Sequence, residues 1–168
     1  MLLFKICMLG SFSVGKTSLV RRFVLSEFNE KYQTSIGVKV DKKIVQVRDQ
    51  QAMLMLWDIY GEDAFQKMQM SYLRGMSGYF LVADGTRRQT VDVALALNEK
   101  VVEAMGKIPF VFLLNKCDLV DQWEIEPDTE QKIVSQGLTP LQTSAKTGEN
   151  VNEAFMRLAL DMQAMLPK

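Results

Sequence analysis

The segment from Gly10 to Thr17 has the residue types that hold phosphate. It reads Gly-Ser-Phe-Ser-Val-Gly-Lys-Thr, which is a glycine, four further residues and then Gly-Lys-Thr. Glycines let backbone N–H groups turn toward phosphate oxygens, Lys16 brings a positive charge to the terminal phosphates, and the Thr17 hydroxyl can bind Mg²⁺. The spacing therefore predicts a phosphate-binding P-loop.

The sequence on both sides of this segment favours a P-loop over an ordinary turn. Residues 2–9 form a largely apolar run typical of a buried parallel strand, and residues 18–25 place apolar side chains at helical spacing. A P-loop requires a strand, a loop and a helix in this order. The positive end of the helix would also face the phosphates.

Three later polar segments follow expected strands. They are Asp58, Asn115-Lys-Cys-Asp118 and Thr143-Ser-Ala-Lys146. Ligands of open α/β sheets gather at the carboxyl ends of the strands. We therefore expect these segments to share one crevice with the P-loop.

Expected strands alternate with expected helices along the whole chain. The strands are residues 2–9, 38–47, 52–57, 79–83, 109–114 and 137–142; the helices are residues 18–25, 65–73, 91–105, a segment from 129, and 151–165. The second and third strands form an antiparallel hairpin at a sheet edge, with Lys39, Lys42 and Lys43 facing water. This order predicts one α/β domain over residues 1–168: a three-layer P-loop NTPase fold with about five helices and a six-stranded, mostly parallel sheet that has one antiparallel edge strand.

The composition excludes several function classes. The 168 residues include 20 basic and 20 acidic side chains, so no charge excess points to nucleic acid, and the lack of histidine excludes imidazole catalysis. Cys7 and Cys117 are expected to be free thiols. Leu2 stands where myristoylation requires glycine, and no C-terminal cysteine can be prenylated. We expect a cytoplasmic protein without a lipid anchor in this chain, or one at a membrane surface if a lipidated tail has been removed.

The motifs together resemble the small GTPases of the Ras superfamily over essentially the whole chain. The matching segments are Gly10–Thr17, Tyr32–Gly37, Asp58–Glu62, Asn115–Asp118 and Ser144–Lys146. Within the superfamily the chain looks most like the Rab branch, because of Ser35-Ile-Gly-Val, Trp57-Asp, Ser71-Tyr-Leu-Arg-Gly and Thr143-Ser-Ala-Lys-Thr-Gly-Glu-Asn-Val. The resemblance implies a molecular switch that binds GTP or GDP with Mg²⁺ and hydrolyses GTP.

The resemblance also assigns roles around the phosphates. Lys16 would neutralise the β- and γ-phosphates, while Thr17 and Ser35 would bind Mg²⁺ directly and Asp58 would hold it through a water. The Gly61 backbone N–H would meet the γ-phosphate. Loss of that phosphate would release the segments 30–40 and 59–73, which effectors, exchange factors and GTPase-activating proteins would read.

The base would be selected by the second group of motifs. Asp118 can accept two hydrogen bonds from guanine, which adenine cannot supply. Asn115 and Lys116 would support the base, the Ala145 backbone N–H would meet the guanine oxygen, and Phe28 would pack on the ring. Further nucleotide contacts are expected from Gly10, Ser13, Val14, Gly15, Ser18, Leu119, Ser144 and Lys146.

Several residues depart from the family pattern near the expected γ-phosphate. Phe12 replaces a small residue, Ile59 and Tyr60 replace Thr-Ala, and Glu62 replaces the glutamine that orients the attacking water. A carboxylate near anionic phosphate is repelled. With Lys16 and Gly61, Glu62 completes the expected catalytic set, and we expect slow hydrolysis.

Two other functions stay open on the sequence. One is a GTP-binding interaction module that recruits partners without useful hydrolysis. The other is a P-loop kinase or ATPase, for which a preference for ATP would be the evidence.

Overall fold

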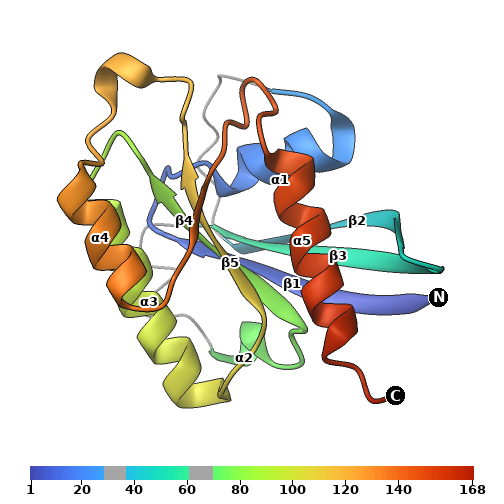
Figure 1. Cartoon of the computed structure of the whole chain (residues 1–168). Coiled ribbons are helices and arrows are strands. Elements are labelled where there is room, and N and C mark those ends of the chain that lie inside the picture. Colours follow the sequence, from blue (N-terminus) through green and yellow to red (C-terminus); the bar gives the residue numbers. More distant parts are fainter. Residues whose placement is uncertain (29–36, 61–69) are drawn as a thin grey trace.

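A six-stranded sheet forms the middle of the molecule (Figure 1). The computed structural model describes residues 1–28, 37–60 and 70–168. The strands lie in the order β2-β3-β1-β4-β5-β6, and only β2 is antiparallel to its neighbour. Their bounds are β1 Leu2–Gly10, β2 Gly37–Val47, β3 Gln50–Tyr60, β4 Gly78–Asp84, β5 Phe110–Asn115 and β6 Pro140–Gln142. The predicted sheet, with its single antiparallel edge strand, is confirmed.

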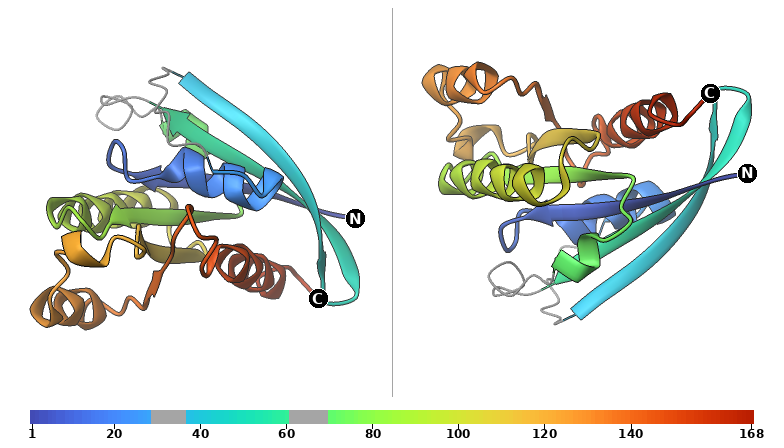
Figure 2. Two further views of the ribbon diagram at one scale, coloured as in Figure 1. Left: turned by 90° about the horizontal axis from the view of Figure 1, so that it is seen from above. Right: turned by 90° about the horizontal axis from the view of Figure 1, so that it is seen from below.

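Helices cover both faces of this sheet (Figure 2). The helices α1 and α5 pack against one face, and α2, α3 and α4 contribute to the core on the other. Their bounds are α1 Lys16–Leu25, α2 Met70–Leu73, α3 Gln89–Met105, α4 Pro127–Ser135 and α5 Val151–Ala164, with a short 3-10 helix η1 at Val120–Gln122. Among the described residues, none of the helices is long and apolar enough to cross a membrane.

The structure corrects several local expectations. The last strand, expected over residues 137–142, is confined to Pro140–Gln142. Asp58 lies inside β3 and not after it, because the β2–β3 ladder continues as far as the pair Gly37 and Tyr60. Helix α4 begins at Pro127, ahead of the expected residue 129, since the fixed φ of proline suits the first helical turn. Lys43 does not simply face water: its ammonium lies 4.2 Å from the centroid of the Phe23 ring.

The strand register brings the carboxyl ends of the central strands together. Gly10 at the end of β1 pairs with Val82 in β4, and Asp84 at the end of β4 pairs with Asn115 at the end of β5. Both chain ends lie on the other side of the molecule, away from the loop that follows β1 (Figure 2). The polar residues that follow the strands therefore gather at one edge of the sheet.

Candidate nucleotide-binding site

The P-loop passes tightly under the end of β5. Gly15 has φ 101°, and a Cβ atom there would collide with the side-chain amide of Asn115. Only glycine fits this close approach without moving Asn115. Helix α1 starts at the next residue, Lys16, so the unpaired N–H groups of its first turn lie directly after the loop. Such an arrangement is suited to an anion.

Lys16 and Asp58 place opposite charges beside the loop: Asp58 is buried and Lys16 is half-buried. The Lys16 ammonium donates a hydrogen bond of 2.8 Å to the Gly10 carbonyl. Burial lowers the pKa of Lys16, and the charge of Asp58 partly opposes that shift. Burial raises the pKa of Asp58, against a hydrogen bond from Thr17 and the charge of Lys16. A phosphate beside Lys16 and a cation beside Asp58 would therefore stabilise the charged forms of these two side chains.

The residues present suit a magnesium ion. The Thr17 hydroxyl donates to Asp58 Oδ2 at 2.6 Å, while Asp58 Oδ1 is buried without a hydrogen-bond partner. An unpaired buried carboxylate oxygen beside a hydroxyl is a donor set of the kind that Mg²⁺ prefers. Thr17 and Asp58 would hold the ion, which would neutralise phosphate charge when bound. Ser35, the third expected ligand, lies outside the described residues.

Side chains at the end of β5 support the P-loop from below. Asn115 Nδ2 donates to the Val14 carbonyl at 2.9 Å, and the Thr143 hydroxyl donates to Asn115 Oδ1 at 3.2 Å. The Lys116 ammonium donates to the Ser13 carbonyl at 3.0 Å. The segment expected to recognise the base is thus fixed directly to the segment expected to bind phosphate.

Asp118 is held in place by the loop that precedes α5. The Ser144 hydroxyl donates to Asp118 Oδ1 at 2.7 Å, and Ser144 in turn accepts the Thr147 backbone N–H at 3.1 Å. Asp118 remains half-buried, so its carboxylate can meet a ligand. Ala145, whose N–H is expected to contact guanine, is buried in this same loop.

The remaining expected residues lie at the rim or outside the described part of the chain. Ser18 lies in the first turn of α1, and the half-buried Leu119 directly precedes η1. Phe28 is 36% exposed, which leaves its ring accessible to a base. Gly61, Glu62 and the side chain of Tyr60 lie outside the described residues.

The sequence did not predict three supporting residues. Arg22 of α1 donates to the Ala145 carbonyl at 2.7 Å and also to the Lys146 carbonyl. Asp84 ends β4 fully buried, and Arg87 follows it. Of these, only Asp84 carried a signal in the sequence, because it follows a buried strand as Asn115 does.

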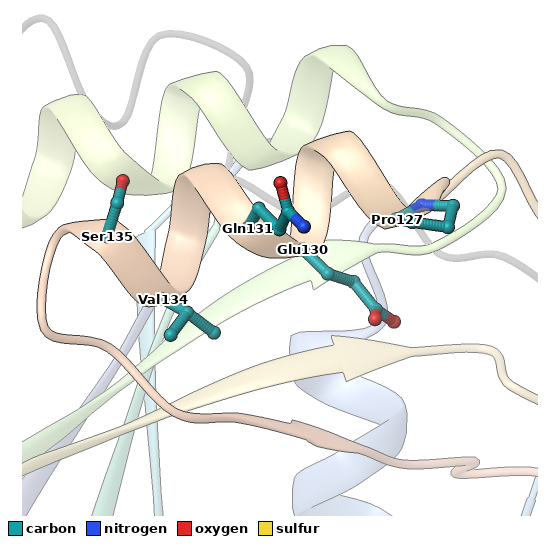
Figure 3. Close-up of a pocket in the computed structure, with 5 residues that line it drawn as sticks. All are labelled: Pro127, Glu130, Gln131, Val134 and Ser135. Carbon is teal, nitrogen blue, oxygen red and sulfur yellow. The ribbon is translucent and has the colours of Figure 1, made fainter.

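A separate shallow hollow lies along α4 (Figure 3). It is lined by Pro127, Glu130, Gln131, Val134 and Ser135. None of these residues belongs to the loops described above. The hollow therefore has no part in the site at the strand ends.

This fold and this site define a P-loop protein suited to bind a nucleotide. A sequence model of the Ras family matches residues 5–164, and the chain belongs to that family. It is 32% identical over 166 residues to the human Ras-related protein Rab-8B, with 98% of this chain and 80% of that protein covered. The Ras-related protein Rab-8 of Diplobatis ommata is also 32% identical, over 168 residues, with 99% of this chain and 80% of that protein covered.

These relationships confirm the Rab-like resemblance and make the chain a GTP-binding switch of the Ras family. Family members hydrolyse GTP and work through regulators and effectors. Family membership also favours guanine nucleotides over the ATP used by P-loop kinases and ATPases. The fold, the P-loop and the base-recognition motif agree with this class.

Proposed function

We propose that this protein is a Rab-like switch that binds GTP or GDP with Mg²⁺ and hydrolyses GTP slowly. The observation that carries the proposal is Phe12, a large side chain within the loop that meets the phosphates. A ring at this position would take up space that an attacking water or a partner's arginine needs. Slow turnover would keep the GTP form populated for long periods.

Glu62 adds a second reason for slow turnover. Its carboxylate stands in the sequence where a glutamine would orient the attacking water. A carboxylate cannot donate a hydrogen bond to the transition state, and it adds negative charge beside anionic phosphate. Both effects oppose hydrolysis more than they oppose binding.

We further propose that effectors, exchange factors and GTPase-activating proteins bind the segments 30–40 and 59–73. These segments flank the residues expected to meet the γ-phosphate, so its loss would change the surface that partners read. Lys16 would hold the β- and γ-phosphates, and Asp118 would select guanine. A bulky Phe12 would hinder a partner that inserts an arginine.

The same residues favour a second candidate, a GTP-held module that recruits partners without useful hydrolysis. Phe12 and Glu62 together would then stop the reaction instead of slowing it. In this case the protein would stay in one nucleotide state until the nucleotide is exchanged.

Single-turnover hydrolysis distinguishes the two candidates. Purified protein is loaded with GTP and Mg²⁺, samples are stopped over hours, and GDP is separated from GTP by chromatography. Gradual appearance of GDP supports the slow switch, and intact GTP throughout supports the module. Conversion complete within the first minutes contradicts both.

A further inference from the structure

Arg87 reaches from the loop between β4 and α3 to the P-loop. Its Nη2 donates a 2.8 Å hydrogen bond to the Phe12 carbonyl, and its Nε donates to Asp84 Oδ2 at 3.0 Å. Asp84 is fully buried, whereas the Arg87 side chain is 35% exposed. Asp84 thus holds the Nε side of the planar guanidinium, while Nη2 of the same group binds the P-loop.

Asp84 joins Arg87 to the base-recognition segment. Its Oδ2 also lies 2.9 Å from the Lys116 ammonium, which holds the Ser13 carbonyl. Burial by itself would raise the pKa of Asp84, but hydrogen bonds from Lys116, Thr86 and Arg87 outweigh it and lower the pKa. One buried carboxylate therefore connects two cations that hold neighbouring P-loop carbonyls.

These contacts determine how the peptide between Phe12 and Ser13 is turned. In a trans peptide the C=O and the N–H point in opposite directions. Because the Phe12 carbonyl is held toward Arg87, the Ser13 N–H points away from Arg87. Ser13 has φ 61°, a left-handed conformation that is uncommon for a residue other than glycine. A left-handed residue beside a right-handed one can turn successive N–H groups into an anion-binding nest, and such a conformation persists only when its surroundings hold it.

Arg88, the next residue, provides an internal comparison. Its Nε donates to the Thr129 hydroxyl at 3.1 Å, and its backbone N–H donates to Glu124 at 2.9 Å. It thus ties the start of α3 to α4. Two adjacent arginines therefore hold different parts of the molecule.

We propose that Arg87 is a positioning residue for the phosphate chain of the nucleotide. It fixes the Phe12–Ser13 peptide so that the Ser13 N–H faces the bound nucleotide, and this contact slows release of the nucleotide. The inference rests on nucleotide binding at the P-loop and is independent of the rate of hydrolysis. Arg87 thus connects the end of β4 to the P-loop, in addition to the contacts that Asn115 and Lys116 make with the loop.

The test measures release of fluorescently labelled GDP into excess unlabelled GDP. Arg87→Ala should release GDP about fivefold to tenfold faster than the wild type, as expected for loss of one partly exposed charge-assisted hydrogen bond. Arg87→Lys should lie between the two, because a lysine keeps the charge near Asp84 but lacks the fork. The matched control Arg88→Ala should release GDP at the wild-type rate.

Phosphorus NMR of bound GDP separates positioning from general loosening of the fold. We expect Arg87→Ala to move a phosphate resonance of bound GDP, while the preference for GDP over inosine diphosphate stays unchanged because Asp118 sets it. Wild-type release together with unchanged resonances in Arg87→Ala would overturn the proposal. An equal effect of Arg88→Ala would also overturn it.

If Arg87→Ala does not fold, Arg87→Lys decides: faster release with a moved resonance supports the proposal, and wild-type behaviour contradicts it. If the wild type itself fails to retain GDP, the nucleotide-binding function is wrong, which is a different result from equal retention by wild type and variant.

Discussion

At the scale of single residues, we expect Asp118 to set the choice of base. The Ser144 hydroxyl donates to its carboxylate at 2.7 Å. The carboxylate would accept hydrogen bonds from two donors of guanine. In Asp118→Asn, an amide N–H₂ faces the guanine amine, so two charge-assisted hydrogen bonds are lost. We expect GDP affinity to fall by roughly 100-fold or more.

Xanthine carries an oxygen where guanine carries the amine, and that oxygen can accept from the new amide. Asp118→Asn should therefore bind xanthosine diphosphate better than the wild type does. Competition against fluorescent GDP measures both affinities. Asp121→Asn, on the exposed 3-10 helix, is the matched control and should bind like the wild type. Unchanged GDP affinity in Asp118→Asn would remove Asp118 from base recognition.

The Cys7 thiol makes the free energy of unfolding depend on pH in the alkaline range. Burial raises the pKa of this thiol from 9.0 to about 12, with the charge of Lys5 slightly opposing the shift. Between these values the folded protein keeps a proton that the unfolded chain releases, so the free energy of unfolding falls as the pH rises from 9. The slope from this single group is at most about 1.4 kcal/mol per pH unit.

Urea unfolding at successive pH values from 9 upward measures this slope. Cys7→Ala has no thiol to titrate, so its free energy of unfolding should fall less steeply than that of the wild type. Below pH 8 the two proteins should differ by a constant amount. Equal slopes above pH 9 would contradict the assignment to Cys7.

At the scale of elements, an aromatic stack joins α1 to α5. Phe23 and Phe155 are stacked with ring centroids 4.0 Å apart. The Phe155 ring also lies against the Phe80 ring of β4, with 4.6 Å between their centroids. Phe155→Ala would leave a cavity between two helices and the sheet. We expect a loss of about 3–5 kcal/mol in the free energy of unfolding.

The matched control for this variant lies on the same helix. Leu160 of α5 is 36% exposed, whereas Phe155 is 0% exposed, so Leu160→Ala removes less buried surface and should cost less than Phe155→Ala. Urea unfolding measures both variants. Similar losses at the two positions would show that the aromatic stack is not the main contact of α5.

The elements also show which parts of the fold follow from the sequence. The alternation of apolar strands with amphipathic helices predicted the sheet and its covering, because parallel strands must be buried on both faces. The apolar run ends at Trp57, so the local pattern predicts that Asp58 follows the strand. In the structure, pairing with β2 extends β3 to Tyr60, a non-local effect that the local pattern does not contain.

At the scale of the whole molecule, the site combines local motifs with contacts between distant segments. Gly15, Lys16 and Thr17 could be assigned because their roles depend on spacing within one loop. Arg22 and Arg87 could not, because they hold backbone carbonyls of segments far away in the chain, and any residue type supplies a carbonyl. Such ties become visible only when the strand order places the segments side by side.

The central claim is that this switch hydrolyses GTP slowly because Glu62 and Phe12 oppose the attack of water. Single-turnover hydrolysis of the wild type beside Glu62→Gln tests it most directly, since glutamine removes the charge and restores a hydrogen-bond donor while the size is kept. We expect slow formation of GDP by the wild type and about tenfold faster formation by Glu62→Gln, with nucleotide binding unchanged. Equal rates for the two proteins, or a faster wild type, would contradict the claim.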